Sequence, residues 1–549
     1  MIFENPAMLK IIKSKKDIIS LIVISIILSV GLCGAALYIS NEYFKTHAYF
    51  YDPVGDYSRT IPFYERMQQE ADLNPIASRI NFAKIWFQAD PKSPFLYIPT
   101  ILLYPKLLTT PWAMMPAMFF ALSSLLCMLG YSLRLRNQSF LSVISILLLF
   151  CAGHLMLNPE RGIAAGWLDL PASFLLTSGI IAFLNWRDFR NRYWLLLSAV
   201  FIALASMSRS TIIIYAAILL CVPIILSYIE QRTSLKTLGL YILLIAIFIT
   251  PFYYYSFDFN YRYYTSLNSG IADSVSSSIT LFMHTFSIIG IAYMIGFVLL
   301  LLFLFYKHRQ IVILQSKYSV GIFLWILVIL PIFWVFVQKT GNTYHVYLTL
   351  YSLFFILFLG ITNWLKTTIN KSISYSIIVF YSITMINSFI THLHTAQNPT
   401  LEATDTKQLY TNIAKHVAQL QPNETWLAYF AEDVTRIANV EAYNQYGVYP
   451  KKYAQGILYF HHSYWQVQYE SMTETEIADS LVKVLHKNTF VIIPHSHESI
   501  DSIIPQQYTT TRKVLYTTLN YIIKNNWEKR DRFRSVKYGK LEVYYNSSH

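Results

Sequence analysis

The sequence predicts an all-α, polytopic membrane domain followed by a soluble C-terminal domain of α/β or α+β type. Of its 549 residues, 54% are hydrophobic and only 13% are charged, and the mean hydropathy is +0.39. Most of a chain with this composition needs lipid as its solvent. Long apolar runs recur up to residue 391, and from Asn398 onward the composition becomes that of a soluble domain.

Eleven apolar runs have roughly the length that a transmembrane helix needs. The first is too long for the core of a signal peptide, so we interpret it as a retained anchor. We divide the run at 193–229 into two spans at Arg209, because a single span there would invert every later one. The predicted spans are 18–40, 112–131, 139–157, 166–185, 193–207, 210–229, 237–257, 279–306, 318–338, 345–365 and 372–391.

Lysines and arginines are distributed unevenly between the two sides of these spans. They crowd the N-terminal segment 1–17 and alternate loops such as those with Arg134 and Arg187, whereas the short turns on the other side contain only Arg161, Arg209, Arg262 and Lys339. Cytoplasmic loops of membrane proteins carry such an excess. We therefore expect a multi-pass protein of the plasma (inner) membrane, with a cytoplasmic N-terminus and an extracytoplasmic C-terminal domain. The same excess accounts for the net charge of +13, so no nucleic-acid partner is implied.

The membrane domain is predicted to span 18–394, and the soluble domain 395–549. Strands are expected at 426–430, 490–494 and 541–545, and helices at 405–419 and 474–486, from the spacing of their apolar residues. All four cysteines lie inside apolar runs, so no disulfide framework is expected even in an extracytoplasmic domain. This domain should face the same side as the first loop, 41–111.

That first loop contains two carboxylates in the stretch YDPVGDY. Asp52 and Asp56 are four residues apart, but Pro53 and Gly55 favour a bent loop over a helical turn. Either carboxylate could act as a general base that takes a proton from an acceptor hydroxyl. The alternative is a structural role in Asx turns or helix caps.

Two further charged residues lie at the outer edge of the predicted bundle. Asp169, in GWLDLPAS, begins the fourth span and could cap that helix or orient a substrate or cation. Lys92 lies in DPKSP, where repeated prolines predict short helices that dip into the outer leaflet. Its ammonium group suits a lipid phosphate, although it could also simply extend to lipid headgroups.

Arg161 and Arg209 lie at outer helix ends. Their guanidinium groups could form bidentate hydrogen bonds with phosphate oxygens or pair with a carboxylate. Tyr344 and His345 open the tenth span and could contact substrate or be packed side chains. No complete spacing of zinc ligands occurs, so we predict no metal site, and a divalent cation has no support in the sequence. The lack of P-loop, GxGxxG and GxSxG motifs gives no support to nucleotide-driven or serine-hydrolase mechanisms.

The order of these motifs resembles the GT-C glycosyltransferases, in particular the protein O-mannosyltransferases and the aminoarabinose-to-lipid-A transferases. The resemblance covers residues 18–365. It matches the first-loop acid to Asp52 or Asp56, the lysine before a proline to Lys92, the second acid to Asp169 in LDLP, and a basic residue between the fifth and sixth spans to Arg209. The family often has a basic or His residue followed directly by Pro-Pro, whereas this chain has Lys-Ser-Pro. Asp90 lies two residues from Lys92, where the family has an acid beside the basic residue, and this departure argues against a metal role.

The resemblance implies an integral-membrane glycosyltransferase that uses a polyprenyl-phosphate-linked sugar. One first-loop aspartate would be the base, Lys92, Arg161 and Arg209 would stabilise the phosphate, and the anomeric configuration would invert. The sugar stays open, as does the acceptor, which could be a glycan, a lipid or a protein. Alternatives are an O-antigen polymerase or ligase, a flippase or transporter of lipid-linked sugars, and a non-catalytic scaffold. A flippase or transporter should carry charges near the midpoints of its spans.

Overall fold

The computed structural model describes most of the chain outside residues 267–370. Three predicted spans, 279–306, 318–338 and 345–365, therefore lie outside the described residues. The described residues are 15–48, 51–70, 75–90, 93–136, 138–160, 162–166, 168–210, 212–229, 233–266, 371–421, 426–428, 434–448, 489–503, 509–536 and 538–546, with single positions 424, 473, 476, 479 and 485.

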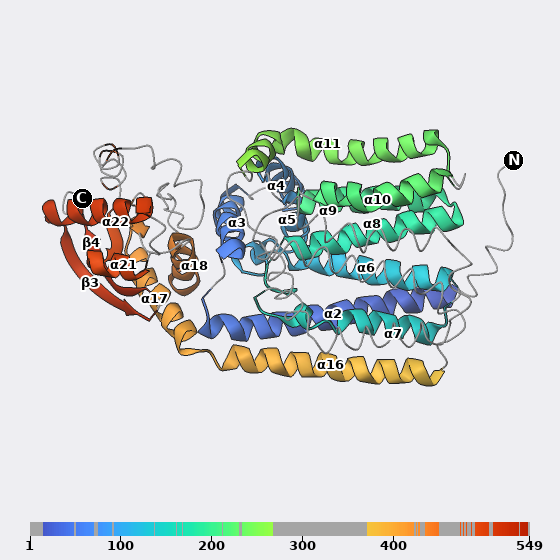
Figure 1. Cartoon of the computed structure of the whole chain (residues 1–549), viewed down its shortest axis with the longest axis horizontal. Helices are drawn as coiled ribbons and strands as arrows, with labels where there is room; N and C mark the ends of the chain where they lie inside the picture. Colours follow the sequence, from blue (N-terminus) through green and yellow to red (C-terminus); the bar gives the residue numbers. More distant parts are fainter. Residues whose placement is uncertain are drawn as a thin grey trace.

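Long helices run side by side and form a bundle (Figure 1). Five described helices are long and apolar enough to cross a membrane, and they are α2 (Lys15–Thr46), α6 (Met115–Leu135), α10 (Ile212–Ile229), α11 (Leu235–Ser266) and α16 (Lys371–Gln397). Beside them lie α7 (Phe140–Cys151), α8 (Asp169–Phe189) and α9 (Arg192–Ser208). The predicted helical membrane domain is confirmed. The count of eleven spans stays a prediction, because α7 and α9 have only 12 and 17 residues.

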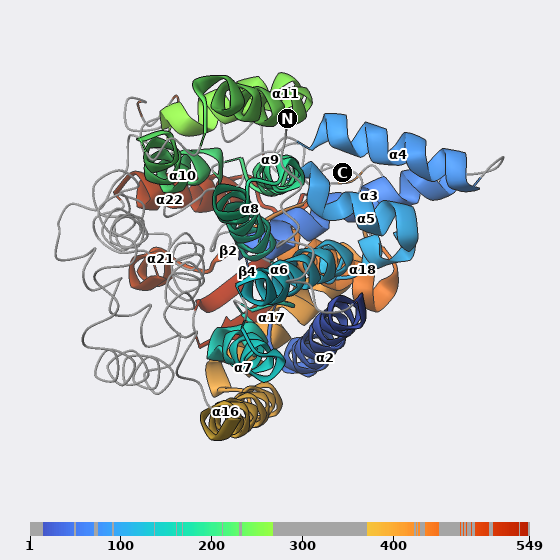
Figure 2. The same ribbon diagram turned by 90° about the vertical axis from the view of Figure 1, so that its right-hand side faces the viewer.

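Helix α8 lies at the centre of the bundle, with α6, α9 and α10 around it (Figure 2). Nearly all of its side chains are buried, and they join a hydrophobic cluster shared with the neighbouring helices. Its contact with α9 is tightest at Gly179, where a Cβ would come within 2.8 Å of Cγ1 of Ile202. Ser198 of α9 donates a 2.7 Å hydrogen bond to the carbonyl oxygen of Gly179. The missing side chain at position 179 thus lets two backbones approach closely.

The bundle has two ends, which we call the domain-side end, toward the C-terminal domain, and the far end, where α2 begins (Figure 1). The described cations of the predicted cytoplasmic loops lie at the far end, among them Arg134, which pairs with Asp17. Arg136 there is buried and pairs with Asp188 at 2.6 Å. The described cations of the short loops predicted to be cytoplasmic therefore gather at one end of the bundle. Which side of a membrane the far end faces stays a prediction.

Four short helices precede α6 and lie at the domain-side end. They are α3 (Tyr51–Glu70), α4 (Pro75–Ala89), α5 (Pro94–Leu103) and the 3-10 helix η1 (Pro105–Thr109). The last three begin at a proline, whose missing N–H is no loss in the first turn of a helix. The proline spacing thus produces the short helices that it predicted.

The predicted bend at Pro53 and Gly55 is wrong, since both residues lie within the helix α3. Pro53 is the third residue of the helix, where the backbone N–H has no partner in the helix to lose. Glycine in a helix costs only about 1 kcal/mol, which packing can offset.

The C-terminal domain is built on a four-stranded sheet of order β1-β2-β4-β3. Strand β1 (Trp426–Ala428) runs parallel to β2 (Phe490–Pro494), while β4 (Gly539–Tyr545) is antiparallel to both β2 and β3 (Glu528–Ser535). Helices α17 (Leu401–Val417) and α18 (Val434–Tyr446) share a hydrophobic cluster with the sheet, and α21 (His497–Ile503) contacts β2 and β4 and packs against α22 (Thr509–Lys524). Every residue of β2 is buried, as in a strand covered on both faces.

Strands β1, β2 and β4 coincide with predicted strands, and α17 with the helix predicted at 405–419. Strand β3 was not predicted, because only Phe533 and Ser535 of its sequence EKRDRFRS are buried, so it shows little hydrophobic alternation. The helix predicted at 474–486 lies almost entirely outside the described residues.

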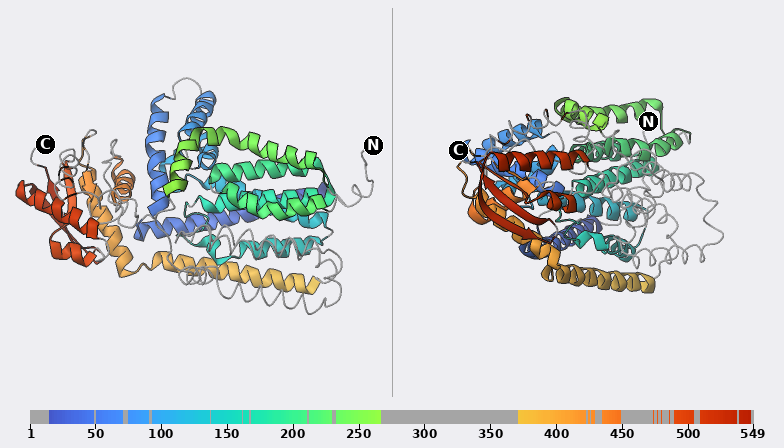
Figure 3. Two further views of the ribbon diagram at one scale, coloured as in Figure 1. Left: turned by 45° about the horizontal axis from the view of Figure 1, so that its top comes forward. Right: turned by 60° about the vertical axis from the view of Figure 1, so that its left-hand side comes forward.

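Helix α3 connects the two domains, and in the left view of Figure 3 it lies between them. Ile61 of α3 is fully buried in the cluster that contains Ile413 of α17 and Ala438 of α18. Met67 of the same helix belongs to a second cluster, with α4 and α5. A single helix therefore takes part in the packing of both domains.

Candidate functional site

Asp169 and Arg209 form an ion pair at the domain-side end of the bundle. Nε of Arg209 lies 3.1 Å from Oδ1 of Asp169, and the two side chains are 20% and 6% exposed, respectively. The N–H direction does not make this contact an aligned hydrogen bond, so the attraction is ionic. Burying a carboxylate without a counter-charge would cost several kcal/mol, and the arginine compensates for that burial.

Both residues of this pair stand at helix ends. Asp169 is the first residue of α8, where the helix dipole favours a negative charge. The N-cap of α8 is Leu168, so the alternative prediction, that Asp169 is the capping residue, is wrong. Arg209 follows the last residue of α9 in an extended conformation, with φ −153° and ψ 114°.

The turn after Arg209 is held in place by a neighbouring helix. The hydroxyl of Tyr253 on α11 donates a 2.7 Å hydrogen bond to the carbonyl oxygen of Ser210, and α10 begins at Ile212. The predicted division of 193–229 at Arg209 is thus confirmed.

A second ion pair fastens α3 to the turn between α4 and α5. The guanidinium of Arg59 donates a 3.0 Å hydrogen bond to Oδ1 of Asp90, which is 3% exposed. The hydroxyl of Ser93 lies 3.4 Å from Oδ2 of the same carboxylate. The buried carboxylate of Asp90 therefore contacts both Ser93, which follows residues 91–92, and Arg59 of α3.

Aromatic packing joins these short helices to the start of α8. Trp86 of α4 contacts Phe63 of α3 and Tyr97 of α5 edge to face. Their cluster also includes Leu168, the residue before Asp169. Helix α5 in addition contacts α9, which ends next to Arg209. The first-loop helices and the Asp169–Arg209 pair therefore meet at one end of the bundle.

Comparisons with known proteins find similarity in structure only, since no family model and no curated protein matches the sequence. ArnT from Cupriavidus metallidurans in the apo state matches with a TM-score of 0.56 and 13% identity, over 94% of this chain and 98% of that one. The same protein bound to undecaprenyl phosphate gives a TM-score of 0.54 with the same identity and coverage. This chain has the GT-C fold. Arabinofuranosyltransferase AftD from Mycobacteria also matches, with 12% identity and a TM-score of 0.43, over 94% of this chain and 40% of that one.

Within this GT-C fold, the structure brings together some predicted site residues and leaves others undescribed. Asp169 and Arg209 are in contact. Asp52 and Asp56 lie in the first two turns of α3, where a spacing of four residues places both positions on one face of the helix. The remaining candidates lie outside the described residues, and they are Lys92, Arg161, Tyr344 and His345.

The sequence did not single out Arg59, Tyr253 or the role of Asp90. Arg59 could have been found from the sequence, because an aspartate beside a membrane re-entry needs a cation nearby. Arg59 lies in the same loop, seven residues after Asp52 at helical spacing. No comparable signal marks Tyr253, one of 42 tyrosines in the chain.

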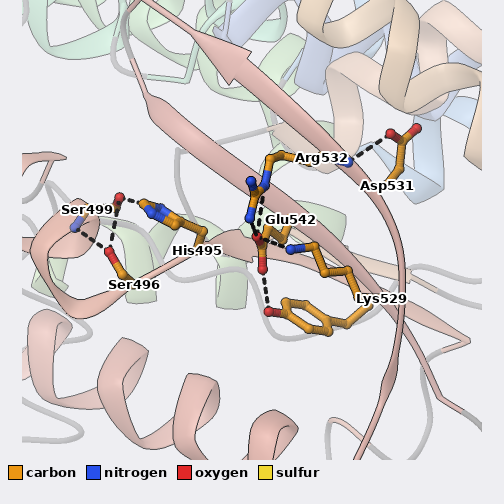
Figure 4. Close-up of polar contacts among 8 residues, drawn as sticks. His495, Ser496, Ser499, Lys529, Asp531, Arg532 and Glu542 are labelled. Carbon is orange, nitrogen blue, oxygen red and sulfur yellow. Dashed lines mark hydrogen bonds and ion pairs between the residues drawn. The ribbon is translucent and has the colours of Figure 1, made fainter.

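A separate group of polar residues in the C-terminal domain has structural partners (Figure 4). Glu542 of β4 receives hydrogen bonds from Lys529, Arg532 and Tyr544. Burial raises the pKa of Glu542, but these hydrogen bonds outweigh burial and hold the pKa below its ordinary value. The cluster therefore resembles a strand-to-strand ion pair more than a proton-transfer site.

His495 and two serines lie near this cluster (Figure 4). Nδ1 of His495 is 2.6 Å from the hydroxyl of Ser499, and Oγ of Ser496 accepts the N–H of Ser499 at the start of α21. Within the described part of the chain, no three His, Cys, Asp or Glu side chains are grouped to hold a metal ion.

Proposed function

We propose that this chain is an integral-membrane glycosyltransferase, which moves a sugar from a polyprenyl-phosphate donor to an acceptor hydroxyl on the extracytoplasmic face. The observation that carries the proposal is the Asp169–Arg209 pair, located where the first-loop helices meet a bundle of GT-C fold. ArnT, which shares the fold, has been solved with undecaprenyl phosphate bound, which supports a lipid phosphate as the anchor of the donor.

Arg209 is the described residue best suited to contact the donor phosphate. A guanidinium group can donate two parallel hydrogen bonds to phosphate oxygens, and the side chain of Arg209 is 20% exposed. Asp169 then acts as a positioning residue that fixes the guanidinium. Lys92 and Arg161 would add charge to the same phosphate, and Tyr344 and His345 would contact the substrate.

The transfer step follows from these assignments. One of Asp52 and Asp56 accepts the proton of the acceptor hydroxyl as its oxygen attacks the anomeric carbon. The bond between that carbon and the phosphate oxygen breaks, and its electron pair leaves with the polyprenyl phosphate. Cations beside the phosphate stabilise the charge that grows on it during this step. Attack from the opposite face inverts the configuration.

The distribution of charge favours an enzyme over a transporter of lipid-linked sugars. Helix α10 has no charged residue, and the charges of α6 and α8 stand in their first or last turns. A transporter would place ionisable groups near the midplane. An O-antigen polymerase or ligase would use the same face, and its product would distinguish it.

The test is mass spectrometry of lipids, glycans and exported proteins from cells that lack the gene and are complemented with variants. The wild type should restore a hexose, pentose or amino-sugar increment, and the Asp52→Asn/Asp56→Asn double variant should lower it about 100-fold or more while still accumulating in membranes. Glu70→Gln is the matched control, since it removes an exposed carboxylate of the same helix that pairs with the exposed Arg66. Full activity of the double variant would remove the assignment of the base.

A further inference from the structure

A second site lies at the far end of the bundle, away from Asp169 and Arg209. A cavity of about 590 Å³ opens where α8 and α10 end and α9 and α11 begin, and its volume is in the range of small-molecule sites. Arg190 and Arg192 line it together with Trp186, Tyr228, Ser234 and Thr237. The cavity therefore combines cations, aromatic rings and hydroxyl groups.

The two arginines of this cavity differ from the other arginines at the far end. Asp188 is shared by Arg136 at 2.6 Å and Arg187 at 3.5 Å, and Arg134 pairs with Asp17. Among the residues that the structure describes, neither Arg190 nor Arg192 has a carboxylate within ion-pair distance. An open cavity lined by two guanidinium groups that have no carboxylate partner among the described residues is suited to an anion.

The backbone gives a separate reason to assign a role to Arg190. This residue has φ 57° and ψ 18°, a left-handed conformation that glycine and asparagine adopt more easily than arginine. The turn between α8 and α9 thus holds an arginine where backbone preference favours another residue. The hydroxyl group of Ser234 is engaged in capping α11, because its Oγ accepts the N–H of Thr237. The charge that would recognise an anion therefore comes from the two arginines.

The rim of the cavity is apolar on the side of α10. Tyr228 and Ile229 are 47% and 57% exposed at the end of this membrane-spanning helix. Tyrosines at such a depth lie at the level of lipid headgroups. The rim is thus suited to the glycerol and the first carbons of acyl chains, which a free anion lacks.

We propose that this cavity binds the phosphate of an anionic phospholipid from the leaflet at the far end, which the charge asymmetry predicts to be the cytoplasmic one. Arg190 and Arg192 hold the phosphate, and Tyr228 and Ile229 contact the acyl chains. Basic pockets between membrane helices bind acidic headgroups in this way. The proposal is independent of the glycosyltransferase assignment, because it concerns the opposite end of the bundle.

The test uses the purified full chain in detergent, with phosphatidylglycerol, phosphatidylcholine and inorganic phosphate as probes. Phosphatidylglycerol should raise the melting temperature and remain bound in native mass spectrometry, and the other two should do neither. Arg190→Asn with Arg192→Gln should weaken phosphatidylglycerol binding about tenfold or more, since it removes two charge-assisted contacts. Asparagine suits the left-handed conformation at 190, so this variant should melt like the wild type without lipid.

Lys84→Gln with Lys106→Gln is the matched control, because it removes the same charge from exposed positions on α4 and η1. This control should bind phosphatidylglycerol like the wild type. Equal binding by the Arg190/Arg192 variant, an equal effect of phosphatidylcholine, or a full effect of inorganic phosphate would each overturn the proposal. If the double variant has a lower melting temperature than the wild type without lipid, the single variant Arg192→Gln is tested in its place. Phosphatidylglycerol binding by Arg192→Gln that is as strong as in the wild type would overturn the proposal.

Discussion

The two ends of the bundle each hold a partly buried arginine–carboxylate pair, in different surroundings. At the far end, Arg136 is 5% exposed and donates hydrogen bonds to Asp188, Asn185 and Ser132, which belong to α6 and α8. At the domain-side end, Arg209 is 20% exposed and stands where the chain breaks between α9 and α10.

This difference shows that an ion pair alone does not mark a functional site. The contacts of Arg136 join two long helices, and its ring partner Phe189 is only 5.4 Å from the guanidinium, so the residue is held on several sides. Arg209 is next to a helix break and to the first-loop helices, and its side chain is more exposed than that of Arg136. We therefore expect the Asp169–Arg209 pair to serve activity and the Arg136–Asp188 pair to serve stability.

The largest effect is expected for activity at the domain-side end. Arg209→Gln or Asp169→Asn should lower the rate of transfer per folded molecule about 100-fold or more, because an oriented charge at the leaving phosphate is lost. Arg136→Gln should leave that rate unchanged. The measurement is the restored sugar increment in complemented cells, divided by the amount of folded protein. Equal losses at both ends would end the distinction between them.

The next effect is on stability at the far end. Arg136→Ala removes the nearer of the two arginines paired with Asp188, which is 26% exposed, and should destabilise the bundle by about 2–3 kcal/mol. The melting temperature in detergent reports the loss. Arg136→Met combined with Asp188→Leu should recover most of it, since a matched apolar pair removes the unpaired charge. Failure of this double variant to recover stability would assign Asp188 another role.

A smaller effect is expected midway between the ends. Gly179→Ala forces its methyl group against Ile202 and should destabilise the protein by about 1–3 kcal/mol without a selective loss of activity. Ile202→Ala in the same chain should relieve the clash in part. Gly239→Ala is the control, because nothing lies within 4 Å of a Cβ there. A selective loss of activity in Gly179→Ala would extend the functional region into the bundle.

The smallest effect concerns a carboxylate outside the membrane. The folded pKa of Glu542 is depressed, so its ionised form stabilises the domain above its ordinary pKa, and this stability is lost as the pH falls through the lowered value. Melting temperatures measured between about pH 5 and pH 3 should therefore fall less in Glu542→Gln than in the wild type. Glu402→Gln, an exposed residue of α17, should follow the wild type. Parallel curves for all three would show that the Glu542 cluster contributes no pH-dependent stability.

Much of the membrane domain could be predicted because apolar length and loop charge are properties of short segments. The break at Arg209 is an example, since charge alternation required it and Tyr253 now supports it. Alternation of the spans also predicts that Asp169 and Arg209 lie at the same end. Their direct contact could not be predicted, because it depends on how closely α8 and α9 pack at Gly179.

The errors come from positions where tertiary packing overrides local preference. Pro53 and Gly55 suggested a bend, yet their helix is held by the buried contacts of Ile61 and Met67 further along. Strand β3 could not be recognised from its charged sequence, since its pairing with β4 orders it. Local sequence contains little information on either contact.

The shared packing of α3 has a mechanical consequence. Position 52 lies about 22 Å along the helix from Met67, at 1.5 Å per residue. A rotation of the helix by about 5° about Met67 would therefore move position 52 by about 2 Å. Because Ile61 is embedded in the core of the C-terminal domain, a swing of that domain turns the helix with it. A displacement of the C-terminal domain is therefore expected to move the backbone at positions 52 and 56 relative to the bundle.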